Sequence, residues 1–174
     1  MKSANRTPIW VYPTAAAVGL GAAIAGVYVW QTWFQPDLRP TFSLPDLDDQ
    51  ERSITEWDGD LIVLNFWATW CPPCLNEIPV FTELQSQYGD EGVQFVGLAL
   101  DDRDDAREWY DKLEMNYPSL YGVQEGMNLT EAYGNEMRTM PYTVVIDQDG
   151  VIVHRFGREI DRDDIEPVIR EHLP

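Results

Sequence analysis

The chain has 174 residues and a formal net charge of −18 at pH 7, and its length fits one domain with material left over. Residues 1–36 carry a charge of +2, which leaves −20 on the remaining residues. A segment this acidic repels nucleic acid and anionic lipid headgroups, so we expect no nucleic-acid partner.

The first predicted element is a membrane-spanning helix. No charged residue occurs between Arg6 and Asp37, and residues 9–29 are mostly Ala, Gly, Val, Ile and aromatic residues. About 20 apolar residues cross a bilayer core, and Trp and Tyr at both ends match interfacial aromatic belts. Because Lys2 and Arg6 precede the run, the positive-inside rule places the N-terminus in the cytoplasm and the acidic part outside.

These features predict four segments: a short cytoplasmic N-terminus at 1–8, a transmembrane anchor at 9–34, a linker at 35–40 and a folded domain at 41–174. The expected location is the cell inner membrane, crossed once, with the folded domain on the periplasmic, extracytoplasmic side. A cleaved signal peptide is the alternative, because Ala23-Ile24-Ala25 would permit cleavage.

The folded domain is predicted to alternate strands with helices. In chain order we expect an edge strand at 41–47, a strand or helical turn at 53–57, a buried strand at 61–67, a helix from the cysteines to Tyr88, a buried strand at 93–100, a helix at 104–113, a short strand at 119–121, a helix at 128–133, strands at 142–146 and 151–156, and a helix from Asp161. This order predicts an α/β fold with a mixed sheet flanked by helices.

Cys71 and Cys74 are the only cysteines of the chain, and they follow the apolar run 61–67. A strand that leads directly into a helix places Cys71 at the helix N-terminus, where unpaired N–H groups and the helix dipole favour a thiolate. We therefore predict Cys71 as the attacking nucleophile and Cys74, one turn further, as the resolving thiol. Pro72 and Pro73 fit the first helical turn and stiffen the loop between the sulfurs.

Other uses of this cysteine pair are less favoured. A structural disulfide closing so short a loop constrains the unfolded chain little, and the two histidines of the chain do not complete a common zinc spacing. A copper site of Cys71, Cys74 and His154 stays open because thiolates suit Cu(I), and a peroxidase needs only one low-pKa cysteine. Thiol-disulfide exchange is favoured because C-x-x-C beside alternating strands and helices is typical of redox couples. It requires no cofactor besides the Cys71–Cys74 disulfide.

Three stretches of the sequence resemble the membrane-anchored thioredoxin-like proteins of the TlpA/ResA type. They are Asn65–Cys74 continued by Glu77–Pro79, Met140–Asp147 followed by Gly150, and Phe42–Leu47 with Trp57. The resemblance covers the part of the chain from Thr41 onward and implies a thioredoxin-like fold.

The resemblance also implies a protein-disulfide reductase that acts outside the cytoplasm. Several members of the type serve cytochrome c maturation by reducing the haem-attachment cysteines of apocytochrome c. Because the extracytoplasmic side is oxidising, such a reductase needs electrons from a membrane protein partner. A disulfide-forming oxidase stays the alternative.

Further site residues follow from matched positions. Pro141 matches the family's cis-proline, which lies against the disulfide and presents backbone to an extended substrate. Met140, Trp70 and Pro72, which are expected to flank the sulfurs, are predicted to bind the substrate with it. Glu77 matches an acid of the active site, and it could receive protons during exchange if burial raises its pKa. The alternative is that Glu77 is an exposed helix acid.

Two positions depart from related proteins. Thioredoxin carries a buried aspartate where this chain has Asn65, and an amide does not titrate, so a proton relay is left to Glu77 or water. Ala68 stands where peroxiredoxin relatives have threonine, which weakens the peroxidase alternative.

Overall fold

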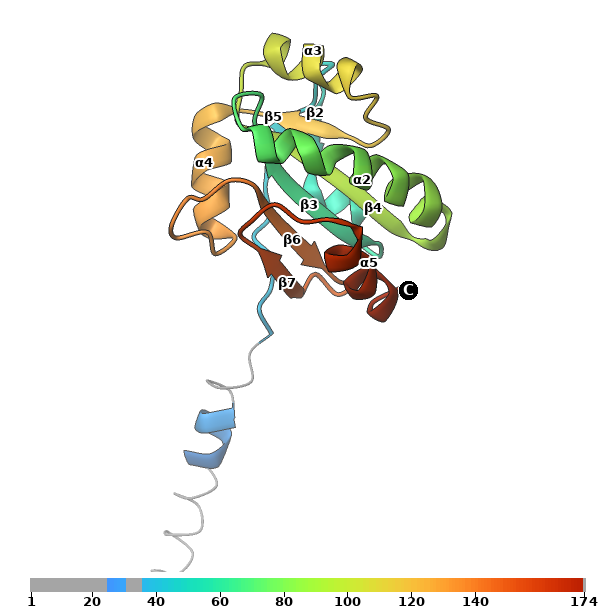
Figure 1. Cartoon of the computed structure of the whole chain (residues 1–174). Coiled ribbons are helices and arrows are strands. Elements are labelled where there is room, and N and C mark those ends of the chain that lie inside the picture. The colour runs from blue at the N-terminus through green and yellow to red at the C-terminus, as the bar shows by residue number, and fades with distance from the viewer. Residues whose placement is uncertain (1–24, 31–35, 174) are drawn as a thin grey trace, which may run out of the picture. The chain divides into compact units, whose positions relative to one another are not determined.

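The structure is a computed structural model that describes residues 25–30 and 36–173 (Figure 1). The chain divides into two compact units, Met1–Pro36 and Asp37–Pro174. In the first unit residues 25–30 are helical, and most of the predicted transmembrane anchor at 9–34 lies outside the described residues. Within the described ranges, no helix has the length and apolar character that a membrane crossing requires. The anchor therefore stays a prediction.

The Asp37–Pro174 unit alternates strands with helices in the predicted order. Its elements are β1 (Ser43–Pro45), β2 (Glu51–Ser53), the 3₁₀ turn η1 (Ile54–Trp57), β3 (Leu61–Trp67), α2 (Pro72–Tyr88), the 3₁₀ turn η2 (Gly89–Glu91), β4 (Val93–Ala99), α3 (Arg103–Lys112), β5 (Ser119–Tyr121), α4 (Val123–Ala132), β6 (Tyr142–Ile146), β7 (Ile152–Phe156) and α5 (Arg162–Glu171). The bounds of β3, β5 and β6 agree with the predicted strands, whereas the edge strand predicted at 41–47 is shorter.

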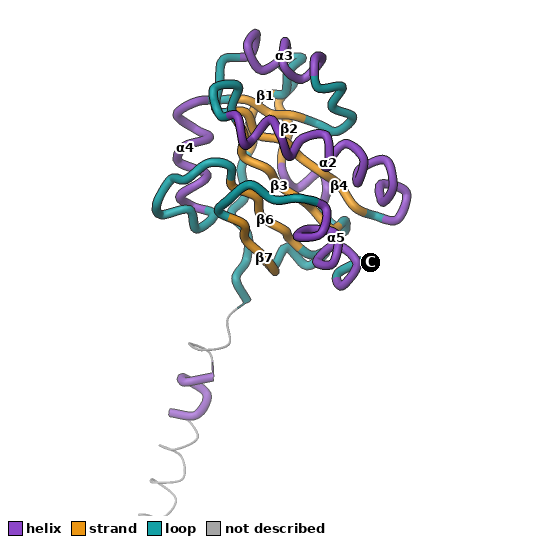
Figure 2. The backbone as a smooth tube through the Cα atoms, in the orientation of Figure 1, coloured by secondary structure: helices purple, strands orange, loops and turns teal. Residues whose placement is uncertain are grey.

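Five strands form one mixed sheet in the order β5-β4-β3-β6-β7 (Figure 2). β3, β4 and β5 are parallel, and β6 and β7 are antiparallel to their neighbours. β3 is central and buried along its whole length, which explains why its sequence is a nearly continuous apolar run rather than an alternating one. The predicted α/β fold with a mixed sheet is confirmed.

Helix α2 covers one face of the sheet together with α5. Phe81 of α2 packs against Phe95 of β4, with ring centroids 5.4 Å apart. Arg162 of α5 donates a hydrogen bond to Glu83 of α2 at 3.1 Å. The helix that begins at the cysteines is therefore held both by the sheet and by the last helix.

Helix α4 covers the opposite face and begins earlier than predicted. Its first residue is Val123, whereas the sequence prediction began at Asn128. Gly126 explains the difference: a Cβ atom at this position would lie only 2.8 Å from Cδ2 of Leu98 and 3.2 Å from Leu100. Because no side chain intervenes, the helix lies close to the sheet, and this packing offsets the low helix propensity of glycine.

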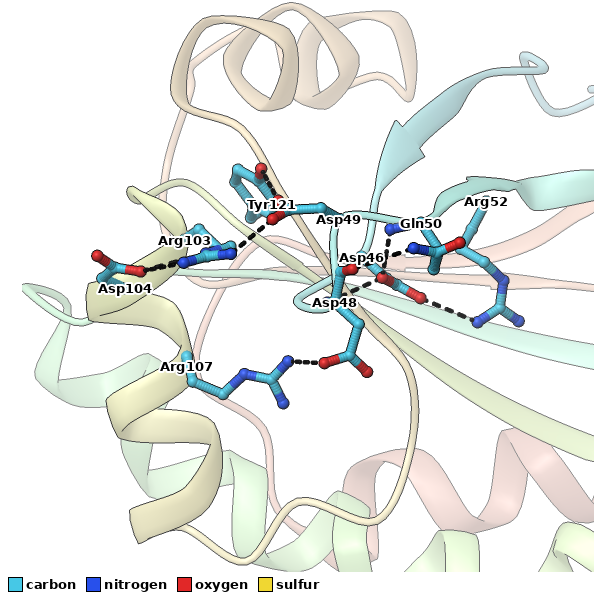
Figure 3. Close-up of polar contacts among 9 residues, drawn as sticks. All are labelled: Asp46, Asp48, Asp49, Gln50, Arg52, Arg103, Asp104, Arg107 and Tyr121. Atoms are coloured by element: carbon cyan, nitrogen blue, oxygen red, sulfur yellow. Dashed lines mark hydrogen bonds and ion pairs between the residues drawn. The ribbon is translucent and has the colours of Figure 1, made fainter.

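Strands β1 and β2 form a separate antiparallel hairpin, whose acidic turn lies against α3 and β5. Asp49 contacts Arg103 at 2.5 Å and accepts a hydrogen bond from the hydroxyl of Tyr121 at 2.8 Å, while Asp48 pairs with Arg107 (Figure 3). These side chains are largely exposed, so each pair contributes little by itself. Together they fix the position of the turn.

The segment around the hairpin reaches both outer strands of the sheet. Leu38 forms an antiparallel bridge with Val151, which precedes β7, and Asp46 forms one with Leu120 of β5. Residues 38–46 therefore extend from one edge of the five-stranded sheet to the other.

Candidate active site

The two cysteines lie where β3 passes into α2. Cys71 is the N-cap residue with an extended backbone, and Pro72 and Pro73 occupy the first helical turn, where a missing N–H does not break a helical bond. Cys71 and Cys74 form a disulfide with 1.97 Å between the sulfurs and 5.3 Å between the Cα atoms. The backbone N–H of Cys74 donates to the carbonyl oxygen of Cys71 at 3.0 Å.

The two sulfurs differ in accessibility. Cys71 retains 5% of its surface, whereas Cys74 is completely buried. Cys71 also lies at the positive end of the helix dipole, which favours its thiolate in the reduced state. The assignment of Cys71 as the attacking thiol and Cys74 as the resolving thiol stays a prediction.

The residues expected to bind substrate lie at the same edge of the sheet as the cysteines. Met140 and Pro141 precede β6, which begins beside the end of β3 because these strands are antiparallel. The peptide bond between them is cis, as expected from the resemblance. Trp70 is 62% exposed and Pro72 is exposed, while Met140 is half-buried and Pro141 is buried. Their roles in substrate binding stay predictions.

Glu77 of α2 is buried next to the central strand β3, with only 1% of its surface exposed. Its Oε1 accepts a hydrogen bond from Nδ2 of Asn65 at 2.7 Å, and its Oε2 accepts one from the backbone N–H of Ile160 at 3.3 Å. The pKa of Glu77 is raised from 4.5 to about 8, because burial and, to a smaller extent, the charge of Glu159 outweigh these two hydrogen bonds, which lower it. The alternative of an exposed helix acid is therefore wrong, and Glu77 can take up and release a proton near neutral pH.

Asn65 links Glu77 to the neighbouring strand. It is completely buried in β3, directly opposite Thr143 of β6, and its Nδ2 also donates to the hydroxyl oxygen of Thr143 at 3.0 Å. Its Oδ1 is buried and accepts no hydrogen bond from the described residues. The amide therefore holds the carboxyl group of Glu77 in a fixed place but cannot itself carry a proton.

Asp101 is a site residue that the sequence predictions missed. It follows β4 and is 7% exposed, and its carboxylate accepts a hydrogen bond from the backbone N–H of Thr69 at 2.6 Å. Thr69 lies two residues before Cys71 in the sequence. An acid directly after a buried strand was the available signal, because the carboxyl ends of parallel strands meet at one edge of a sheet.

His154 does not lie with the cysteines. It is exposed on β7 opposite Val145, which pairs with Val63 in the first half of β3. The imidazole packs on Phe156 with ring centroids 4.2 Å apart, and the described part of the chain contains no cluster of ligands that could hold a metal ion. The copper site of Cys71, Cys74 and His154 was therefore a wrong prediction, because the register of the strands separates its ligands.

The family model for Redoxin matches residues 36–169. The chain belongs to the Redoxin family. It is 27% identical over 136 residues to the thiol-disulfide oxidoreductase ResA of Bacillus thuringiensis. The aligned region covers 78% of this chain and 76% of the relative. It is 34% identical over 117 residues to the thioredoxin-like protein YneN of Bacillus subtilis, and the aligned region covers 65% of each chain.

Solved structures agree with this membership. One of them is the crystal structure of a putative thiol:disulfide interchange protein DsbE from Chlorobium tepidum. Its superposition covers 80% of this chain and 98% of the other chain, with 24% identity and a TM-score of 0.73. This similarity shows the thioredoxin-like fold. Together with the disulfide at the start of α2, the family relationship identifies this Redoxin-family chain as a protein-disulfide oxidoreductase of the TlpA/ResA type.

Proposed function

We propose that the protein is a membrane-anchored reductase of protein disulfides that works outside the cytoplasm. The observation that carries this proposal is the buried Glu77, one helical turn behind a disulfide whose Cys71 alone reaches the surface. Such an arrangement supplies a nucleophile, a resolving thiol and a nearby proton acceptor.

The first step uses the reduced enzyme. The Cys71 thiolate attacks one sulfur of a substrate disulfide, a mixed disulfide forms, and the other substrate sulfur leaves as a thiolate that takes a proton from water. In this proposal Trp70, Met140 and Pro141, which lie at the same edge of the sheet as Cys71, hold an extended substrate segment.

The second step uses the buried pair. Glu77 is mostly protonated at neutral pH because its pKa is about 8, so the base is its ionised fraction. In that fraction the Cys74 thiol transfers its proton to the carboxylate of Glu77, and the resulting thiolate attacks the Cys71 sulfur of the mixed disulfide. The second substrate sulfur leaves and receives a proton, which returns Glu77 to its ionised form. Two electrons have then moved from the enzyme dithiol to the substrate, and the enzyme ends with the Cys71–Cys74 disulfide.

The predicted anchor at 9–34 and the positive N-terminus support an extracytoplasmic location for the domain. An oxidising environment does not regenerate the dithiol, so a membrane protein must supply electrons. Among protein substrates, apocytochrome c with its paired haem-attachment cysteines is the class that the TlpA/ResA type suggests. The net charge of −20 on residues 37–174 disfavours nucleic acid as a partner.

The test uses the full chain in detergent micelles, with insulin as the disulfide substrate and dithiothreitol as the reductant. We expect the wild type to accelerate insulin reduction, Cys74→Ser to accumulate a mixed disulfide, and Cys71→Ser to form none. Equal trapping by the two variants would contradict the assigned roles, and no acceleration by the wild type would refute the reductase.

The reduction potential tests the direction of electron flow. A value near that of thioredoxin, about −270 mV, supports a reductase, whereas a value near −120 mV, about that of DsbA, would make the protein a disulfide-forming oxidase. Equilibration of the full chain with glutathione redox buffers measures it.

A further inference from the structure

The loop that carries the attacking cysteine is held by the loop after β4 through two consecutive contacts. The backbone N–H of Leu100 donates to the carbonyl oxygen of Trp67 at 2.8 Å, and the carboxylate of Asp101 accepts the backbone N–H of Thr69 at 2.6 Å. The N–H of Cys71 then donates to the carbonyl oxygen of Ala68 at 3.2 Å. Three hydrogen bonds therefore hold the stretch between the end of β3 and the start of α2.

The Asp101 contact is the one in this series that involves a charged side chain. Hydrogen bonds to an ionised carboxylate are stronger than bonds between neutral groups, and Asp101 is nearly buried, so water competes little for the N–H. Burial raises the pKa of Asp101, the Thr69 donors lower it, and the nearby Asp102 and Asp105 raise it. The net effect is a raised pKa, so the contact to Thr69 offsets part of the cost of burying this carboxylate.

This contact gains importance when the disulfide opens. In the oxidised protein the bond to Cys74 restrains the Cys71 side chain covalently. In the dithiol form that restraint is absent, while the contacts of Leu100 and Asp101 to the loop do not depend on the sulfurs. The reduced enzyme is the form that must align its thiolate with both sulfurs of a substrate disulfide, and small errors in such alignment slow a reaction strongly.

We propose that Asp101 is a positioning residue, which fixes the Thr69–Cys71 loop so that the Cys71 thiolate of the reduced enzyme meets a substrate disulfide in line. This inference rests on the disulfide exchange proposed for Cys71. It assigns Asp101 no contact with the reacting atoms, and it predicts an effect that depends on the redox state.

The test compares the two half-reactions in the full chain. Tryptophan fluorescence in a stopped-flow instrument follows oxidation of the reduced enzyme by oxidised glutathione and reduction of the oxidised enzyme by dithiothreitol. In Asp101→Ala we expect the first rate, divided by the thiolate fraction from ultraviolet absorbance, to fall about tenfold or more, with the second rate changed much less. Asp101→Asn keeps an acceptor oxygen and should lie between the wild type and Asp101→Ala.

Asp102→Ala is the matched control. Asp102 is the neighbouring acid, is exposed, and forms no side-chain capping bond to α3, so this variant removes the same charge without removing the contact to Thr69. Equal slowing of both half-reactions in Asp101→Ala, or equal rates in the Asp101→Ala and Asp102→Ala variants, would overturn the inference. Failure of the wild type in both half-reactions would instead refute the proposed function, so the two failures are distinguishable.

Discussion

The side-chain amide of Asn65 donates a hydrogen bond to Oε1 of Glu77 over 2.7 Å, which joins the central strand to the helix of the cysteines. A donated hydrogen bond stabilises the ionised carboxylate, whereas burial stabilises the protonated form. Burial dominates, and the resulting pKa of about 8 leaves Glu77 able to exchange a proton near neutral pH.

Glu77→Gln is expected to make folding stability less dependent on pH. The pKa of Glu77 is about 8 in the folded protein against a reference value of 4.5, so between these values the folded state holds a proton that the unfolded state has released. This stabilisation is complete below the reference pKa and is lost as the pH rises toward 8, by about 1.4 kcal/mol per pH unit. Urea unfolding of the full chain at several pH values measures the slope, which should be flatter in the variant.

Glu83→Gln provides the control for this measurement. Glu83 lies on the same helix with its side chain 69% exposed. If this variant flattened the slope as much as Glu77→Gln, the pH dependence would not arise from the buried carboxyl group.

The same substitution should lengthen the life of the mixed disulfide. An amide cannot accept the proton of the Cys74 thiol, so the resolving step loses its base, an effect of about a hundredfold or more. Acid quenching of single-turnover reactions followed by mass spectrometry measures the mixed disulfide. Unchanged resolution in Glu77→Gln would mean that water, and not Glu77, receives the proton.

Asn65→Leu should raise the pKa of Glu77 by about one to two units, because a hydrogen bond that favours the carboxylate is lost. Carbon-13 NMR of the glutamate side chains across a pH series gives this value. Thr143→Val is the control, since it removes the other partner of the Asn65 amide and leaves the bond to Glu77 in place. A shift as large in Thr143→Val would indicate a general disturbance of the core.

Gly126→Ala should destabilise the domain by about 1–3 kcal/mol, because the added methyl group would force α4 away from Leu98. Gly157→Ala is the matched control: its Cβ would lie 3.6 Å from the nearest atom, Oγ1 of Thr139, which is an ordinary contact. Chemical unfolding compares the two, and equal losses would show that the close packing of α4 does not matter.

The main elements of the fold could be predicted because they depend on local sequence. The apolar run of β3 and the helical spacing after Cys74 identify a buried strand followed by an amphipathic helix. The same spacing could have placed Glu77 on the inner face, because it lies three residues after Cys74 and four before Phe81, which are both buried. Its pKa could not be predicted, because the pKa depends first on burial in the folded domain and then on hydrogen bonds from Ile160 and Asn65, which come from other parts of the chain.

The role of Asp101 could not be predicted in the same way. In the sequence it is one of four aspartates between positions 101 and 105, and charge runs are usually solvated. Its place directly after the predicted strand 93–100 was the one available signal, and only the folded structure shows that Asp101 accepts the hydrogen bond from the backbone N–H of Thr69. The start of α4 was missed for a related reason, since the contact that stabilises Gly126 within the helix comes from β4.

The stretch from Leu38 to Asp46 has a consequence for self-association. Its two bridges lie on the outermost strands of the sheet, where unpaired N–H and C=O groups would otherwise serve as a template for strands of other molecules. One short segment thus shields parts of both vulnerable edges. Removing the residues up to Asp46 would expose these parts of both sheet edges and allow the domain to aggregate by pairing of edge strands from different molecules.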